Sequence, residues 1–158
     1  MSISDMIVVM KDGVIHQMGK PQDVYDDPKD LFVAKFLGTP PINVFHGKVE
    51  GGALFIGQQE ILSVPGISDR EVMVAIRPEG FVPDESGKLS CALNRVEVMG
   101  RDVSIVCSHP DCENTDIRAI VDGDVHVNPL CCEVKFSVKP HKLFLFDAQT
   151  HERLYFEG

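Results

Sequence analysis

The chain has 158 residues, 44% of them hydrophobic and 25% charged, which is enough for one substantial hydrophobic core. A formal net charge of −9 argues against a nucleic-acid partner, because phosphate backbones attract clustered Lys and Arg. No apolar run reaches the roughly 20 residues that span a bilayer, and no signal peptide is visible. Five cysteines, with Cys131 and Cys132 adjacent, predict free thiols in a reducing cytosol rather than disulfides.

The chain opens with a pattern typical of a β-hairpin. Apolar residues predict strands at 7–10 and 14–18. Between them stands the pair Asp12-Gly13, which favours a tight two-residue turn.

Two short helices are expected next. Pro21 predicts the first position of a helix over residues 21–26, although Lys20 before it is a poor N-cap residue. We expect a second helix with Asp27 as N-cap and Pro28 in the first turn, ending at Gly38.

After Pro40 and Pro41 the pattern changes to short apolar strands separated by Gly or Pro turns, so we divide the chain into residues 1–43 and 44–158. Such a series of short strands indicates a mainly β fold that forms a closed or nearly closed barrel. The expected strands cover residues 45–49, 53–56, 60–64, 72–76, 91–99, 102–107, 117–121, 132–138 and 143–146.

The run at residues 72–76 is almost continuously apolar and β-branched, which predicts a strand buried on both faces. Pro78 ends it, because proline cannot donate a ladder hydrogen bond. We therefore expect Arg77 and Glu79 to form a solvated ion pair at the barrel rim. This is a structural pair in the simpler interpretation and a regulatory site in the alternative one.

No residues are assigned as catalytic, cofactor-binding or metal-binding. His109 and the cysteines lack a Cys-x-x-Cys pair, so they are interpreted as ordinary loop and core residues. The other candidates are interpreted as helix caps, a solvated face and a turn; they are Asp23, Asp26, Asp27, Asp30 and the segment Asp122-Gly123-Asp124.

Longer stretches carry a family resemblance. Residues 2–15, 19–28 and 31–43, which include Gly19-Lys20-Pro21-Gln22-Asp23-Val24-Tyr25, resemble the tail of the ATPase domain of ATP-binding-cassette importers of the sugar and glycerol-phosphate type. Val74-Ala75-Ile76-Arg77-Pro78-Glu79 and residues 96–100 resemble the regulatory barrel that follows it, the transport-associated OB domain. Residues 143–154 are similar to the family's last strand and tail, where a Gly is usual at the position of His151.

The resemblance implies a fold and a role. The fold is an OB-like regulatory barrel preceded by a hairpin and two helices of the ATPase domain, and the chain is a C-terminal fragment or a split product of an ATPase subunit. It has no Gly-x-x-x-x-Gly-Lys-Ser/Thr phosphate loop, so ATP and Mg belong to the intact subunit, a transport ATPase. The implied partners are a second copy of the subunit, the membrane subunits and a regulatory protein, at the cytoplasmic face of the membrane.

A second hypothesis is a small-ligand sensor for a sugar or an oxyanion, because barrels of this type bind ligands on one face and in their loops. A cluster of Arg77, Arg95 and Arg101 would attract an oxyanion despite the acidic composition.

Overall fold

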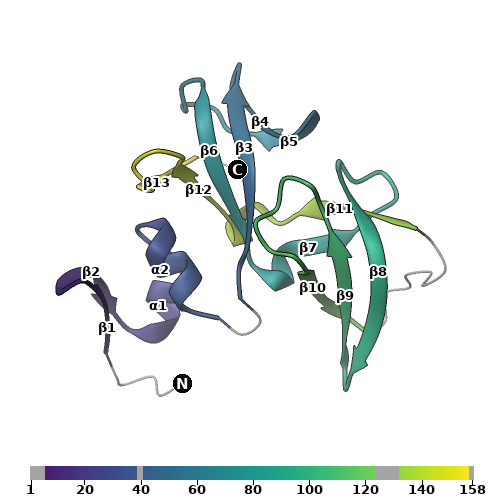
Figure 1. The fold of residues 1–158 in the computed structure, drawn as a ribbon, viewed down its shortest axis with the longest axis horizontal. Coiled ribbons are helices and arrows are strands. Elements are labelled where there is room, and N and C mark those ends of the chain that lie inside the picture. Colours follow the sequence, from purple (N-terminus) through teal and green to yellow (C-terminus); the bar gives the residue numbers. More distant parts are fainter. Residues whose placement is uncertain (1–5, 39–40, 124–131, 157–158) are drawn as a thin grey trace.

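The computed structural model describes residues 6–38, 41–123 and 132–156 and is mainly β, as the sequence predicts (Figure 1). The N-terminal part comprises β1 (Ile7–Lys11), β2 (Val14–Gly19), α1 (Pro21–Asp26) and α2 (Leu31–Phe36). The rest comprises β3 (Asn43–Glu50), β4 (Ala53–Ile56), β5 (Gln59–Ser63), β6 (Arg70–Ile76), β7 (Phe81–Pro83), β8 (Leu89–Met99), β9 (Asp102–Ser108), β10 (Ile117–Asp122), β11 (Glu133–Val138), β12 (Leu143–Asp147) and β13 (Arg153–Leu154). Single-turn helices η1 (Pro78–Gly80) and η2 (Pro140–Lys142) precede β7 and β12.

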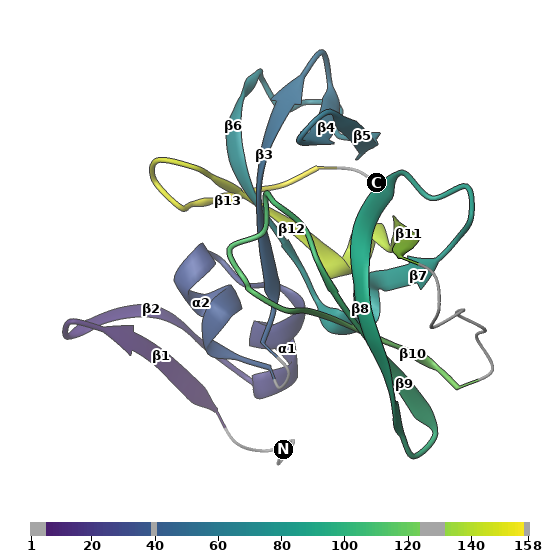
Figure 2. The same cartoon turned by 45° about the vertical axis from the view of Figure 1, so that its right-hand side comes forward.

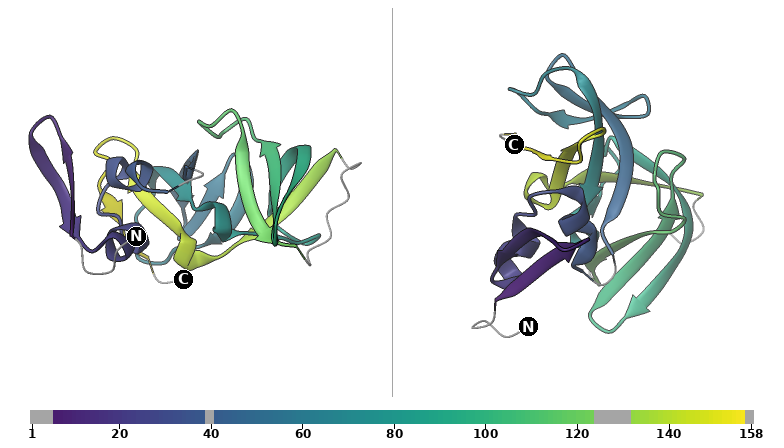
Figure 3. Two further views of the ribbon diagram at one scale, coloured as in Figure 1. Left: turned by 90° about the horizontal axis from the view of Figure 1, so that it is seen from below. Right: turned by 60° about the vertical axis from the view of Figure 1, so that its left-hand side comes forward.

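Strands β1 and β2 form the expected hairpin. Asp12 and Gly13 both have positive φ, 53° and 79°, as a turn whose twist matches the strands requires. The hairpin projects from the molecule at the end opposite the five-stranded sheet (Figure 3, left).

None of the helices among the described residues has the length and apolar character that crossing a membrane requires.

The second helix begins later than the sequence predicts. The Asp30 side chain, and not that of Asp27, caps it by accepting a hydrogen bond from the Val33 amide at 2.9 Å. The amide of Lys29 instead donates to Gln17 Oε1 at 2.9 Å, and Asp30 itself is extended, so the helix begins only after it. Lys20 makes no side-chain cap at α1, as expected.

Two sheets form the barrel-like part. A six-stranded sheet has the order β13-β12-β6-β3-β4-β5 and a five-stranded sheet the order β10-β9-β8-β11-β7. One continuous apolar core receives side chains from both sheets. The sheets approach each other where the Ser90 amide donates to Gln59 Oε1 at 3.3 Å, so the barrel is nearly closed (Figure 2). Strands β7 and β13 were not predicted, because three and two residues are too few to show a periodic pattern.

Strand β6 lies at the centre of the fold and is buried on both faces, as its apolar run predicts. Val74 and Ile76 point into the core between the sheets. Met73 and Ala75 point the other way, into a second core that they share with helix α2. The strand therefore joins the barrel to the N-terminal helices.

The final turn contains a residue in a conformation that favours glycine. His151 has φ 62°, which costs a non-glycine residue roughly 1–2 kcal/mol. His151→Gly is expected to raise the free energy of unfolding by about 0.5–1 kcal/mol, because the relieved strain slightly exceeds the entropy that a new Gly adds to the unfolded chain. Urea denaturation should show this gain. Gln149→Gly, in the same turn at ordinary φ, should lower stability, and an equal effect of both changes would contradict the strain.

Candidate functional site

Arg77 lies where β6 ends and η1 begins, and its side chain is buried, with 1% of the residue exposed. Its Nη1 donates to the carbonyls of Ala34 at 3.2 Å and Leu37 at 2.8 Å. Its Nη2 donates to the carbonyl of Tyr25 at 2.8 Å. All three acceptors belong to the helical segment before the barrel, so this side chain fastens the two parts together.

The geometry follows from the chemistry of helix ends. The last carbonyls of a helix have no intrahelical partner and carry partial negative charge. Ala34 and Leu37 lie at the end of α2 and Tyr25 near the end of α1, so one planar guanidinium satisfies acceptors of two helices. The guanidinium carbon also lies 3.8 Å from the centroid of the Tyr25 ring, a cation–π contact.

The solvated rim pair of Arg77 and Glu79 is therefore wrong. Arg77 is an interior anchor, and Glu79 accepts a hydrogen bond from the Tyr25 hydroxyl at 2.7 Å. Glu79 Oε2 also lies 3.6 Å from Lys142 Nζ, which is its ion-pair partner. The rim hypothesis failed because the partners of Arg77 lie 40 to 52 residues earlier in the chain, and no local pattern shows that α1 and α2 fold over the end of β6.

The electrostatics of this cluster favour charged Arg77 and Glu79. Burial lowers the pKa of Arg77, but arginine keeps its proton because its ordinary pKa is so high. Burial alone would raise the pKa of Glu79. The Tyr25 hydroxyl and the charges of Lys142 and Arg77 outweigh burial and hold the pKa of Glu79 below its ordinary value. Burial, and then the bond to Glu79, raise the pKa of the Tyr25 phenol.

Glu79→Gln is expected to lower stability at neutral pH by less than about 1 kcal/mol, since Glu79 is partly exposed and solvent screens it. A carboxyl with a lowered folded-state pKa contributes stability above its unfolded pKa of about 4.3, and this contribution is lost as the pH falls through the folded-state value. Urea denaturation at about pH 7 and about pH 3 should therefore show a difference only at the higher pH. Glu85→Gln, in an exposed loop, should make no difference at either pH.

A second arginine fastens the tail to the same helical segment. Arg153 Nη1 donates to Asp27 Oδ1 at 2.9 Å and to the Pro28 carbonyl at 2.8 Å. Its guanidinium carbon lies 4.6 Å from the ring centroids of both Phe144 and Tyr155. The sequence does not reveal this role of Arg153, because no local pattern indicates that the tail lies beside the loop between α1 and α2.

Among the described residues, the remaining candidates are not gathered into one group. His109 Nδ1 accepts a hydrogen bond from the Asp111 amide at 3.1 Å, and its ring packs edge-on against Phe45. Within residues 6–38, 41–123 and 132–156, no three or more potential metal ligands gather. Cys91, Cys107, Cys112 and Cys132 are free thiols, whereas Cys131 and Asp124 lie outside the described residues.

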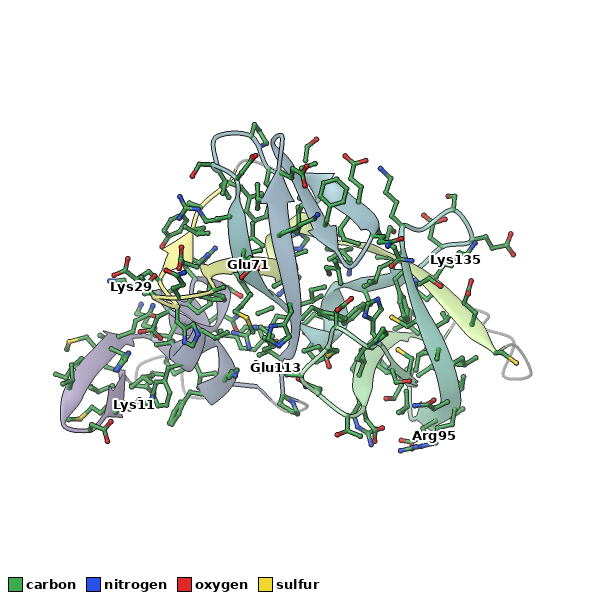
Figure 4. All side chains as sticks on the ribbon, turned by 45° about the horizontal axis from the view of Figure 1, so that its top comes forward. Lys11, Lys29, Glu71, Arg95, Glu113 and Lys135 are labelled. Atoms are coloured by element: carbon green, nitrogen blue, oxygen red, sulfur yellow. The ribbon has the colours of Figure 1, made fainter. Side chains whose placement is uncertain are left out.

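Two of the three arginines of the proposed oxyanion cluster, Arg77 and Arg95, are already bonded to other groups. Arg77 donates its hydrogen bonds to buried carbonyls. Arg95, which Figure 4 labels on β8, donates to Glu97 at 2.7 Å. Glu97 also forms an ion pair with Arg118, at 3.2 Å. An oxyanion would have to displace these partners, so the cluster offers no preformed anion site.

The geometry defines a class of protein: a nearly closed β-barrel held by two arginines to a hairpin-and-helix segment. No family model matches the chain. It is similar to curated ATP-binding proteins of importers: the sn-glycerol-3-phosphate import protein UgpC of Jannaschia sp. (32% identical over 98% of this chain and 43% of that protein), the oligosaccharides import protein MsmX of Bacillus subtilis (30%, 98% and 46%) and the sulfoquinovosyl glycerol transport protein SmoE of Agrobacterium fabrum (32%, 98% and 45%).

The chain thus spans less than half the length of the curated relatives it matches. It is similar to the C-terminal part of sugar and glycerol-phosphate importer ATP-binding subunits, which confirms the resemblance seen in the sequence. Among solved structures, the molybdate-binding protein ModG is similar at 15% identity with a TM-score of 0.45, over 65% of this chain and 93% of that one.

Proposed function

We propose that the chain is the regulatory and dimerisation part of an importer ATP-binding subunit that energises uptake of a sugar or related solute. The observation that carries this proposal is the similarity to importer ATP-binding proteins along 98% of the chain. In this proposal residues 1–43 are the end of the ATPase domain, and residues 44–158 are the transport-associated OB-like barrel. The hydrogen bonds of Arg77 and Arg153 connect the two parts and let each part influence the other.

An apolar face on the hairpin supports the assignment of residues 1–43. Val9 and Gln17 face the helices and are buried, whereas the opposite face is exposed. Exposed apolar surface of this extent on a small hairpin is typical of a surface that another part of a protein covers. We propose that the rest of the ATPase domain packs there. The exposed apolar side chains of that face are Met6, Val8, Met10, Ile15 and Met18, and Val14 is exposed beside the turn.

We propose that the binding site for ATP lies outside this chain. The sequence has no phosphate loop, and the strand β1 is followed by a hairpin turn instead of a phosphate-binding loop and helix. We propose that ATP and Mg bind the remainder of the intact subunit. Its partners are a second copy of the subunit, the transporter's membrane subunits and a regulatory protein, at the cytoplasmic face of the membrane.

The test is a domain exchange. The matching C-terminal part of the Bacillus subtilis MsmX protein is replaced by this chain, and ATP hydrolysis and oligosaccharide uptake are measured. The exchanged protein is expected to support both, and the isolated chain to sediment as a dimer and to give no calorimetric signal with Mg-ATP. Micromolar Mg-ATP binding by the isolated chain, or a monomer at high concentration together with an inactive exchange, would refute the proposal.

A further inference from the structure

A surface cleft of about 270 Å³ lies on the outer face of the six-stranded sheet. Its walls come from β3, from β6, from Gly57 between β4 and β5, and from Ala148 after β12. His46 and Lys48 are exposed and lie two residues apart on β3, so both point to this face. Glu71 enters from the neighbouring strand, opposite Lys48 in the register. Figure 4 labels Glu71 and Glu113 on this side of the molecule.

The polar groups of the cleft differ in how well they are satisfied. Lys48 Nζ lies 3.2 Å from Glu50, and His46 Nε2 lies 3.8 Å from Glu113. Within the part of the chain that the structure describes, the Glu71 carboxylate has no hydrogen-bond or ion-pair partner. The cleft therefore presents one free carboxylate beside two nitrogen-bearing side chains.

This combination selects against charged ligands of either sign. A cation would face Lys48, and an anion would face Glu71, and like charges in contact oppose binding. A hydroxyl group both donates and accepts hydrogen bonds, so a ligand with several hydroxyls suits a carboxylate and an ammonium together. The volume lies just below the roughly 300–1,000 Å³ of sites for drug-sized molecules, which favours a smaller ligand.

We propose that this cleft binds a small neutral polyol, a monosaccharide or a molecule of similar size. Glu71 accepts hydrogen bonds from its hydroxyls, and Lys48 and His46 donate to them. The acidic composition and the free carboxylate favour this ligand over the oxyanion of the earlier alternative hypothesis.

The cleft is physically connected to helix α2. Glu113 faces His46 and is also bonded to Lys35 Nζ at 3.0 Å, so one carboxylate bridges the cleft and the helix. The backbone reinforces this connection, because the Glu113 amide donates to the Val44 carbonyl at 2.8 Å. A ligand that binds His46 would weaken or displace the contact between His46 and Glu113, and so alter the ion pair of Glu113 with Lys35. A regulatory role for this site rests on the proposed function of the chain. Ligand binding itself is tested separately.

The test uses the full chain and NMR titration with glycerol, glucose, sn-glycerol 3-phosphate and choline. We expect a neutral probe to give saturable shifts at His46, Glu71 and Ala148, while the anionic and cationic probes give none there. Glu71→Gln removes the charge but keeps the shape, and it should weaken binding by about tenfold or more, because hydrogen bonds to charged groups are the stronger ones.

The matched control is Glu60→Gln on β5, an exposed glutamate 3.9 Å from Lys88 and outside the cleft lining. It should leave the affinity unchanged. Saturable binding of choline or sn-glycerol 3-phosphate at these residues, equal weakening by both variants, or no saturable shift with either neutral probe would overturn the proposal. None of these results bears on the domain exchange, so failure of the ligand site is distinct from failure of the regulatory function.

Discussion

Arg77→Ala is expected to lower the free energy of unfolding by about 3–5 kcal/mol, as much as a large cavity in the core. The substitution leaves the carbonyls of Ala34, Leu37 and Tyr25 without their donor. Each unsatisfied buried group costs about 1–3 kcal/mol, and the total is reduced where water enters the space left by the side chain. Urea denaturation measures the loss.

Two variants make this expectation specific. Arg70→Ala removes a partly exposed arginine that is 3.2 Å from Asp147, and it should cost only about 0–1 kcal/mol. Arg77→Lys keeps the charge but cannot reach three carbonyls from one planar group, so it should recover only part of the loss. If Arg77→Ala cost no more than Arg70→Ala, the buried anchor would be refuted and the solvated rim pair reinstated.

Hydrogen exchange adds a readout of location. Because Arg77 fastens the helical segment to the barrel, its loss should increase exchange first at the amides of α1 and α2. Amides in the core strands β6 and β9 should then exchange only at the slower rate set by global unfolding. Equal acceleration throughout the molecule would instead mean that Arg77 supports the barrel itself.

The strands were predictable because their signals are local. The run that forms β6 is apolar at nearly every position, and a strand between two cores needs apolar side chains on both faces. Asp12 and Gly13 mark the hairpin turn because few other residues adopt positive φ readily. In each case a few neighbouring residues carry the whole physical requirement.

The contacts that fasten the helical segment to the barrel were not predictable, because they depend on residues far apart in the sequence. Asp30, and not Asp27, caps α2, because Lys29 is bonded to Gln17 and to the C-terminal tail and Asp30 is extended. Arg77 next to Pro78 has the local signature of a strand end at a solvated edge. Only the tertiary packing of α1 and α2 over that edge turns it into an interior residue. Local patterns therefore described the parts of the molecule and missed what connects them.

The two arginines also give the proposed regulation a physical route. Arg77 holds the ends of both helices, and Arg153 holds the loop between them. A shift of the barrel would have to break these bonds or carry the helices with it, because a planar guanidinium with several acceptors has little freedom to follow. The helical segment and the barrel are therefore expected to move as one body unless a partner separates them.

Ile76→Ala is expected to lower the free energy of unfolding by about 2–5 kcal/mol. The loss arises in the core between the two sheets and not at the contacts with the helices. Ile76 is fully buried between the two sheets and pairs in register with both Asn43 and Leu143, so its neighbours cannot collapse freely into the space. Ile61→Ala is the matched control, because Ile61 only borders the same core and should cost much less. Unlike Arg77→Ala, Ile76→Ala should accelerate exchange in strands of both sheets. A domain of ordinary stability, about 5–15 kcal/mol, would then approach its limit. Urea denaturation showing equal losses for Ile76→Ala and Ile61→Ala would contradict the assignment of Ile76 to the centre of the core.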